Sequence, residues 1–267
     1  MPAPETTRTA FLIIDTETIP DGGLVAAVKY PDETLSPEEA VERAKEEARN
    51  NKSSTRNPDF LPVTFQIPVA ASVLRVGSDF TLQALTCLDA PHFRTHEIVK
   101  KFWFGLSCYK AKLVTFNGRR FDMPLLELAA LRYGIAARDY FQLSRNRFNG
   151  HIDLCDWLGN YGACYLDGGL NLLAKMIGLP GKCDMKGEMV YPKYLEGKLQ
   201  DINDYCLCDT LDTYFVFLRT RILTGDISPD QEKELVAKSR EMLEAKTEEF
   251  PVLRRYLEAW KPGEPGV

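Results

Sequence analysis

Short runs of apolar residues along the chain predict five strands. Residues 10–16 are almost continuously apolar, which is typical of a strand buried on both faces. Residues 69–76 and 80–87 are separated by a Gly-Ser-Asp turn, a spacing that predicts a β-hairpin. Residues 112–116 and 151–154 supply two further short apolar segments. We therefore expect a five-stranded sheet.

Helical spacing of apolar residues follows these strands. The expected helices cover residues 92–108, 121–131, 168–177 and 201–223, and Pro251 separates two more beyond them. Asp201 is the expected N-cap of the long helix. Strands alternating with helices predict a mixed α/β sheet with helices on its faces. In such sheets, functional sites lie at the carboxyl ends of the parallel strands.

Residues 20–62 differ in composition and are interpreted as an insertion. Pro, Asp and two glycines open this stretch, and Ser36 with Pro37 then predicts the start of a helix. The helix has few apolar residues, so we expect it to be exposed. Residues 50–58 are rich in Asn and Ser and predict a loop. A solvated insertion and a lid over a substrate are both open interpretations.

Composition limits the functions that are open to the chain. Its 267 residues are 45% hydrophobic and can bury a sizeable core, and its net charge of −5 argues against a broad basic surface for duplex binding. The start has no apolar signal region, and no run approaches the ~18 apolar residues of a membrane span, so we expect a cytoplasmic protein. Seven cysteines without a Cys-x-x-Cys motif and only three histidines argue against structural zinc.

Carboxylates recur at comparable places in the expected fold. Asp15 and Glu17 would project from the same side at the C-terminal end of the first strand. Adjacent carboxylates repel, and Mg²⁺ or Mn²⁺ would relieve that repulsion. Asp122 begins a helix, and Asp209 lies one helical turn after Tyr205. Taken singly, each acid is explained as a solvated residue, but together and in this order they form a specific pattern.

This pattern resembles the DEDD superfamily of 3′→5′ exonucleases, in the DEDDy subclass with a tyrosine in the last motif. More closely, it is similar to the predicted exonucleases related to the proofreading domain of family B DNA polymerases. The resemblance rests on residues 11–20, 115–126 and 205–209 and extends over roughly residues 9–222. It implies a ribonuclease H-like domain over residues 9–222, with a C-terminal helical extension over residues 223–260 packed on the same domain.

The resemblance also implies an activity: two-metal-ion 3′→5′ cleavage of single-stranded ends that releases nucleoside 5′-monophosphates, with DNA favoured over RNA. Asp15 would bridge two Mg²⁺ or Mn²⁺ ions, and Glu17 and Asp209 would complete the ion that holds the attacking water. Asp122 would act on the second ion. Tyr205 would orient the water, because the pKa of a free tyrosine, about 10, makes it a poor base.

A few other residues are candidate substrate contacts. Thr16 and Lys186 are two of them, and Lys186 lies in a loop that could reach the scissile phosphate. Asn117 could brace the neighbouring aspartate or the nucleotide, or could simply form a turn. Phe121 and Met123 could pack against a terminal base or into the core.

Three other functions are open. A protein of the same fold could bind nucleic acid without cleaving it, although all five positions of the pattern are intact. An acidic metal-buffering module would bind Ca²⁺ without hydrolysis, but the spacing of an EF-hand loop is absent. A ribonuclease H-like endonuclease shares the sheet and the metal chemistry, but the spacing of Tyr205 and Asp209 favours the exonuclease.

Overall fold

A mixed sheet lies at the centre of the computed structural model, which describes residues 7–50, 59–182 and 185–261. Its strand order is β3-β2-β1-β4-β5; β1 pairs antiparallel with β2 and parallel with β4. The five-stranded α/β sheet predicted from the sequence is thereby confirmed. The strands are β1 Thr9–Pro20, β2 Gln66–Gly77, β3 Leu82–Cys87, β4 Lys112–Thr115 and β5 His151–Asp153.

Strand β1 is longer than its apolar run predicts. Its parallel pairing with β4 covers Phe11 to Ile13, whereas its antiparallel pairing with β2 continues to Pro20. The long β2 ladder carries the strand past its polar residues. Asp15 and Glu17 therefore lie inside β1, just beyond the segment paired with β4, and the expectation that they end the strand is wrong.

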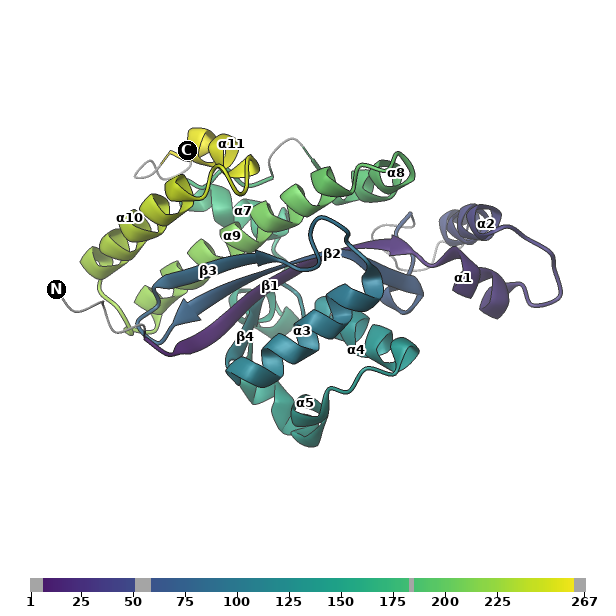
Figure 1. Cartoon of the computed structure of the whole chain (residues 1–267), viewed down its shortest axis with the longest axis horizontal. Helices are drawn as coiled ribbons and strands as arrows, with labels where there is room; N and C mark the ends of the chain where they lie inside the picture. The colour runs from purple at the N-terminus through teal and green to yellow at the C-terminus, as the bar shows by residue number, and fades with distance from the viewer. Residues whose placement is uncertain (1–6, 51–58, 183–184, 262–267) are drawn as a thin grey trace.

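Helices cover both faces of the sheet because the apolar run of β1 points alternately to each side. Leu12 packs with α3 and α4, while Ile13 packs with α7 and α9. Figure 1 shows α3, α4 and α5 on one face and α7, α9 and α10 on the other. These helices are α3 Thr95–Tyr109, α4 Asp122–Tyr133, α5 Arg138–Gln142, α7 Gly169–Met176, α9 Leu199–Leu223 and α10 Pro229–Ala245. No described helix is long and apolar enough to cross a membrane.

The long helix α9 and the two helices after it share one core. The helix begins at Leu199 rather than at Asp201, which lies in its first turn, where a carboxylate suits the positive end of the helix dipole. Helices α10 (Pro229–Ala245) and α11 (Val252–Ala259) pack against α9. Tyr256 of α11 donates a 2.7 Å hydrogen bond to Asp212 of α9, and both side chains are buried.

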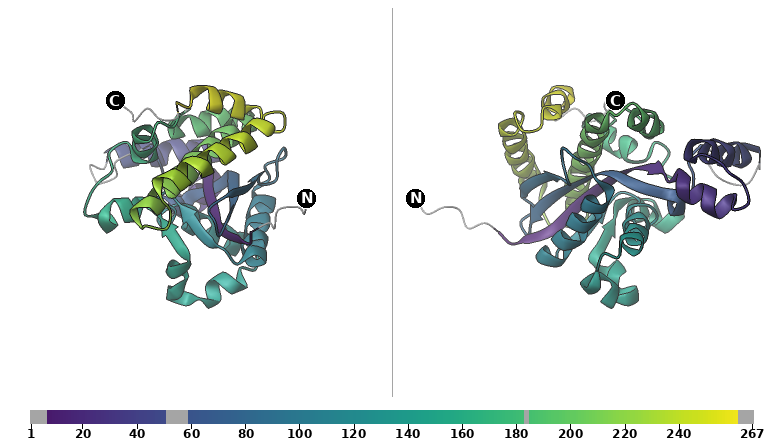
Figure 2. Two further views of the ribbon diagram at one scale, coloured as in Figure 1. Left: turned by 90° about the vertical axis from the view of Figure 1, so that its left-hand side faces the viewer. Right: turned by 45° about the vertical axis from the view of Figure 1, so that its right-hand side comes forward.

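The described part of the insertion contains two helices, α1 (Gly22–Lys29) and α2 (Pro37–Asn50), of which only α2 was expected. Ser36 caps α2 as predicted, and its hydroxyl accepts a hydrogen bond from the Glu39 amide at 3.2 Å. The helix is exposed on one side only, because its small apolar residues pack against α1. Figure 2 shows this pair at one end of the molecule, opposite the start of β1.

Shorter elements complete the described chain. They are the helices α6 (Leu154–Leu158) and α8 (Val190–Leu195), and the 3-10 turns Val63–Phe65, Ser144–Gly150, Asn160–Gly162 and Gly187–Met189. The loop predicted at residues 50–58 and the two terminal tails lie largely outside the described residues.

Candidate functional site

Three carboxylates meet where α9 crosses β1. One side-chain oxygen from each of Asp15, Glu17 and Asp209 lies within 4.8 Å of the other two. Asp15 and Glu17 lie on the same strand face as Ile13, which is the face that α9 covers. Helix α9 supplies Asp209. No other trio of acidic, cysteine or histidine side chains in the described ranges meets this distance. Two of the predicted motifs are thus brought together.

Burial sets the electrostatics of this carboxylate cluster. It is the largest cause that raises the pKa of Asp15 and of Glu17 well above the ordinary value, and repulsion from neighbouring carboxylates adds to it. Burial also raises the pKa of Asp209 to about 6, against the opposing effects of the Tyr205 hydroxyl and Lys182. Each acid therefore resists ionisation unless a positive charge is nearby.

The donor set of the cluster fits a divalent cation. Asp15 Oδ2 is buried and accepts no hydrogen bond from the described residues, which is rare for a charged oxygen because its desolvation is then uncompensated. The cluster consists only of carboxylate oxygens, the ligands that Mg²⁺ and Mn²⁺ prefer. A hard cation would both coordinate the unpaired oxygen and offset the repulsion.

Asp122 lies beside this cluster but outside its three-way contact. It is the first residue of α4, is 2% exposed, and accepts a 2.6 Å hydrogen bond from the Thr16 hydroxyl. Burial raises the pKa of Asp122 to about 7, and the hydrogen bond from Thr16 opposes the rise. Its charge in turn raises the pKa values of Asp15 and Glu17, so the four acids form one electrostatic group.

Thr16, a predicted substrate contact, has its hydroxyl engaged by Asp122. It stands between two acids on a strand, so it points to the opposite face, toward the α4 side of the sheet. Sequence reasoning did not anticipate this contact. The alternation of side chains along the strand does place Thr16 on the face opposite Asp15 and Glu17. The contact with Asp122 could be predicted only once the position of α4 was known.

Two consecutive residues of α9, Tyr205 and Cys206, lie beside the carboxylates. Tyr205 is 6% exposed, and burial followed by repulsion from Asp209 raises the pKa of its phenol. The thiol of Cys206 donates to the main-chain carbonyl of Asp15 at 3.2 Å. This bond, which the sequence did not reveal, is one of the contacts that hold α9 against β1 beside Asp15.

The loop before Asp122 is held by the end of β5. Asp153 accepts hydrogen bonds from the backbone amides of Asn117 at 2.8 Å and Arg119 at 2.9 Å. Asn117 has a φ of 66°, a left-handed conformation that asparagine tolerates better than most residues. Of its predicted roles, the backbone conformation agrees with the turn, and Asn117 also lines the cavity described next.

A cavity of about 850 Å³ opens over the carboxylates. Phe121 lines it, whereas Met123 is 2% exposed and packs in the core. The ring of Phe121 lies 5.7 Å from that of Phe60, with 49° between the ring planes. Two aromatic rings therefore stand at one wall of the cavity, one from the predicted motif and one from the insertion.

Three lysines also line this cavity. Lys45 of α2 is the most enclosed: its side chain is 13% exposed, and its Nζ lies 2.8 Å from Glu42 and 4.8 Å from the centre of the Tyr191 ring. Lys182 lowers the pKa values of Glu17 and Asp209, so it is electrostatically close to the cluster. Lys186, predicted as a phosphate contact, is exposed at the cavity and pairs with Glu188 at 3.8 Å.

Sequence reasoning missed Lys45 and Phe60. Both come from the insertion, whose place against the sheet is not visible in a local pattern. The one available signal was a basic and an aromatic residue within an otherwise polar stretch, which is too common to identify a site.

Comparison with known proteins identifies one family. The model of a family described as predicted 3′-5′ exonuclease related to the exonuclease domain of PolB matches residues 58–260. The matched segment contains Asp122, Tyr205 and Asp209 and continues through α10 and α11, beyond the resemblance seen in the sequence. Asp15 and Glu17 precede it, and the fold brings them to Asp209. No curated protein matches the chain.

Proposed function

The chain belongs to the family of predicted 3′-5′ exonucleases related to the exonuclease domain of PolB, and from this premise we propose that it removes nucleotides from single-stranded 3′ ends with divalent metal ions. The observation that carries the proposal is the convergence of Asp15, Glu17 and Asp209 from β1 and α9. A cluster of partly buried acids with raised pKa values is unfavourable for stability, and such clusters are typical of functional sites.

Two Mg²⁺ or Mn²⁺ ions are the proposed cofactors. Asp15, Glu17 and Asp209 would hold them, and Asp122 would contribute from the side of the cluster. When bound, such ions supply a water that can attack near neutral pH and a positive charge beside the leaving 3′ oxygen. The orphaned Asp15 Oδ2 and the purely carboxylate donor set support this assignment.

The proposed role of Tyr205 is to orient the attacking water. Its raised pKa keeps the phenol protonated at neutral pH, so it can donate a hydrogen bond but cannot act as a base. Thr16 is proposed to act through Asp122: its hydroxyl fixes one carboxylate oxygen and favours the ionised form that binds cations.

The cavity over the carboxylates supports a single-stranded end as substrate. Its volume of about 850 Å³ lies within the range of small-ligand sites, so it suits a terminal nucleotide better than a duplex. Phe60 and Phe121 would contact the terminal base, since unpaired bases stack on aromatic rings. Lys45, Lys182 and Lys186 would attract the phosphates. DNA is proposed over RNA because of the relationship to PolB, with nucleoside 5′-monophosphates as products.

A degradation assay tests the proposal. Single-stranded DNA and RNA of one sequence, labelled at the 5′ end, are incubated with Mg²⁺, Mn²⁺ or EDTA. We expect a ladder that shortens from the 3′ end, needs metal, is faster on DNA, and disappears in Asp15→Asn but not in Asp32→Asn, an exposed control. Binding of the oligonucleotides without cleavage in either metal would overturn the proposed enzymatic activity. It would favour a protein of this fold that binds nucleic acid without cleaving it.

A further inference from the structure

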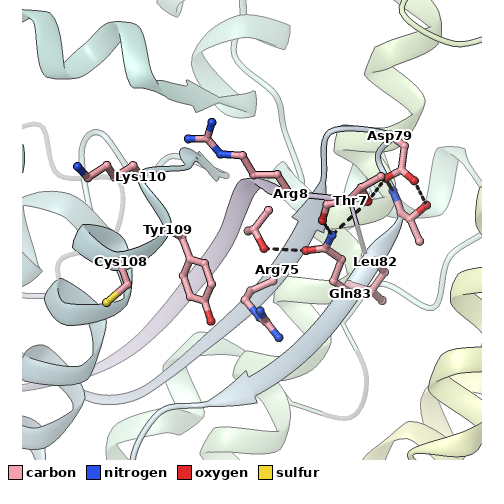
Figure 3. Close-up of a pocket in the computed structure, with 11 residues that line it drawn as sticks. Thr7, Arg8, Arg75, Asp79, Leu82, Gln83, Cys108, Tyr109 and Lys110 are labelled. Atoms are coloured by element: carbon pink, nitrogen blue, oxygen red, sulfur yellow. Dashed lines mark hydrogen bonds between the residues drawn. The ribbon is translucent and has the colours of Figure 1, made fainter. Parts of the chain in front are cut away.

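A second cavity lies at the opposite end of β1 from the carboxylates. Its volume is about 750 Å³, and it is lined by the start of β1, the turn end of the β2–β3 hairpin and the C-terminal end of α3 (Figure 3). Asp15 lies six positions after Thr9 along β1, which is roughly 20 Å at ~3.3 Å per residue. This second cavity is therefore separate from the proposed active site.

Three basic side chains surround the second cavity: Arg8, Arg75 and Lys110 (Figure 3). Within the described segments none of them makes an ion pair, whereas most other described arginines do. The one acid of the lining, Asp79, accepts hydrogen bonds from the hydroxyls of Thr7 and Thr81, so three cations face a single carboxylate. The cavity is thus positive in a chain whose net charge is −5.

Arg75 is the most informative of these cations. It is half-buried on β2, and its cross-strand neighbours are the apolar Leu12 and Ala84. Its guanidinium carbon lies 5.1 Å from the centre of the Tyr109 ring. This cation–π contact carries no negative charge, and no carboxylate of the described residues pairs with Arg75. An anion from outside the chain would complete the arrangement.

Tyr109 indicates what kind of anion fits. The residue is 37% exposed, and its ring together with the Arg75 guanidinium presents flat surfaces on which a nucleobase can stack. Arg8 and Lys110 also line this cavity and would bind the phosphate. The volume suits a ligand of nucleotide size and is large for a bare phosphate.

We propose that the second cavity is a nucleotide-binding site in which Arg8 and Lys110 hold the phosphate and the Arg75–Tyr109 pair holds the base. Such a site lies outside the catalytic cavity, so a nucleotide bound there does not compete with a strand end for the carboxylates. Its chemistry is complementary to a nucleoside 5′-monophosphate.

The test titrates adenosine 5′-monophosphate into the full-length protein by calorimetry in EDTA, which prevents metal-mediated binding at the carboxylates. We expect one saturable site whose Kd rises at least tenfold in Arg75→Gln and in Lys110→Gln. Lys112→Gln is the matched control, since Lys112 is exposed two residues further along and lies outside the lining. If Arg75→Gln does not fold, the Lys110→Gln variant still tests the proposal, because Lys110 is exposed.

Three results would overturn the proposal. One is the absence of saturable binding. Another is an equal loss in the Lys112 control, which would mean a non-specific effect of charge. The third comes from a parallel titration with inorganic phosphate: binding as tight as that of the nucleotide would remove the base contact and leave an anion site only.

Discussion

Asp209→Asn should stabilise the metal-free protein while it destroys the proposed activity. Burial raises the pKa of Asp209 from 3.8 to about 6 in the folded state. One pKa unit corresponds to about 1.36 kcal/mol, so the ionised carboxylate costs the fold ~3 kcal/mol relative to the unfolded chain. Asparagine has nearly the same shape but carries no charge, so the variant should recover most of this free energy.

The gain should depend on pH with a definite sign. The unfolded chain loses the Asp209 proton near pH 4 and the folded protein near pH 6, as the raised pKa requires. Between these values the folded state binds more protons, so its stability falls as pH rises and then stays constant. The variant should therefore match the wild type at or below about pH 4 and exceed it by up to ~3 kcal/mol at pH 8.

Urea unfolding in EDTA at the two pH values measures this difference, and thermal melting should show a shift of up to ~10 °C at pH 8. Asp32→Asn, at an exposed turn position, is the control for loss of an acid elsewhere. Adding Mg²⁺ should raise the stability of the wild type more than that of the variant, because binding to the folded state stabilises it. No gain at pH 8, or an equal gain at both pH values, would refute the reasoning.

Three further substitutions test the other parts of the site. Tyr205→Phe should lower kcat roughly tenfold or more with an unchanged Mg²⁺ titration, because an orienting hydrogen bond of about 1.5 kcal/mol is lost; a full rate would remove that role. Thr16→Val should move the acidic limb of the kcat/KM profile to higher pH, because it removes the bond that opposes the raised pKa of Asp122; an unmoved limb would contradict the contact. Phe60→Ala should raise KM for oligonucleotides roughly fivefold or more at constant kcat, whereas the exposed Phe104→Ala should not, and equal effects would exclude a stacking role.

Much of the sheet could be predicted because burial on both faces leaves a mark in the sequence. Leu12 and Ile13 face opposite helical layers, so the run around them shows no alternation, and this is what identified the central strand. The end of the same strand could not be predicted. It depends on how far β2 continues beside β1, up to the pairing of Pro20 with Gln66, and such pairing is a long-range property.

The acids of the site could also be identified from the sequence, because the spacing of residues in a regular strand or helix determines which side chains point the same way. Asp15 and Glu17 share a strand face, and Asp209 shares a helix face with Tyr205. Spacing does not tell how two elements meet. The contact between α9 and β1 depends on packing and on bonds such as that of Cys206 to the Asp15 carbonyl, which no local pattern reveals.

The walls of the cavity over the carboxylates were least predictable, because Gly22 in the insertion looks like a turn residue. Gly22 belongs to a glycine pair that argues against a helix, yet it begins α1. A Cβ at this position would meet the Pro37 carbonyl oxygen at 2.3 Å, so glycine is what allows α1 and α2 to touch. Asp21 caps α1 and pairs with Arg132 of α4, and Lys45 meets the Tyr191 ring. The insertion is therefore held to α4 at Asp21 and to α8 at Lys45, and its residues Lys45 and Phe60 line the cavity. It follows that the insertion is a structural part of the cavity wall, and any explanation of substrate preference has to include it.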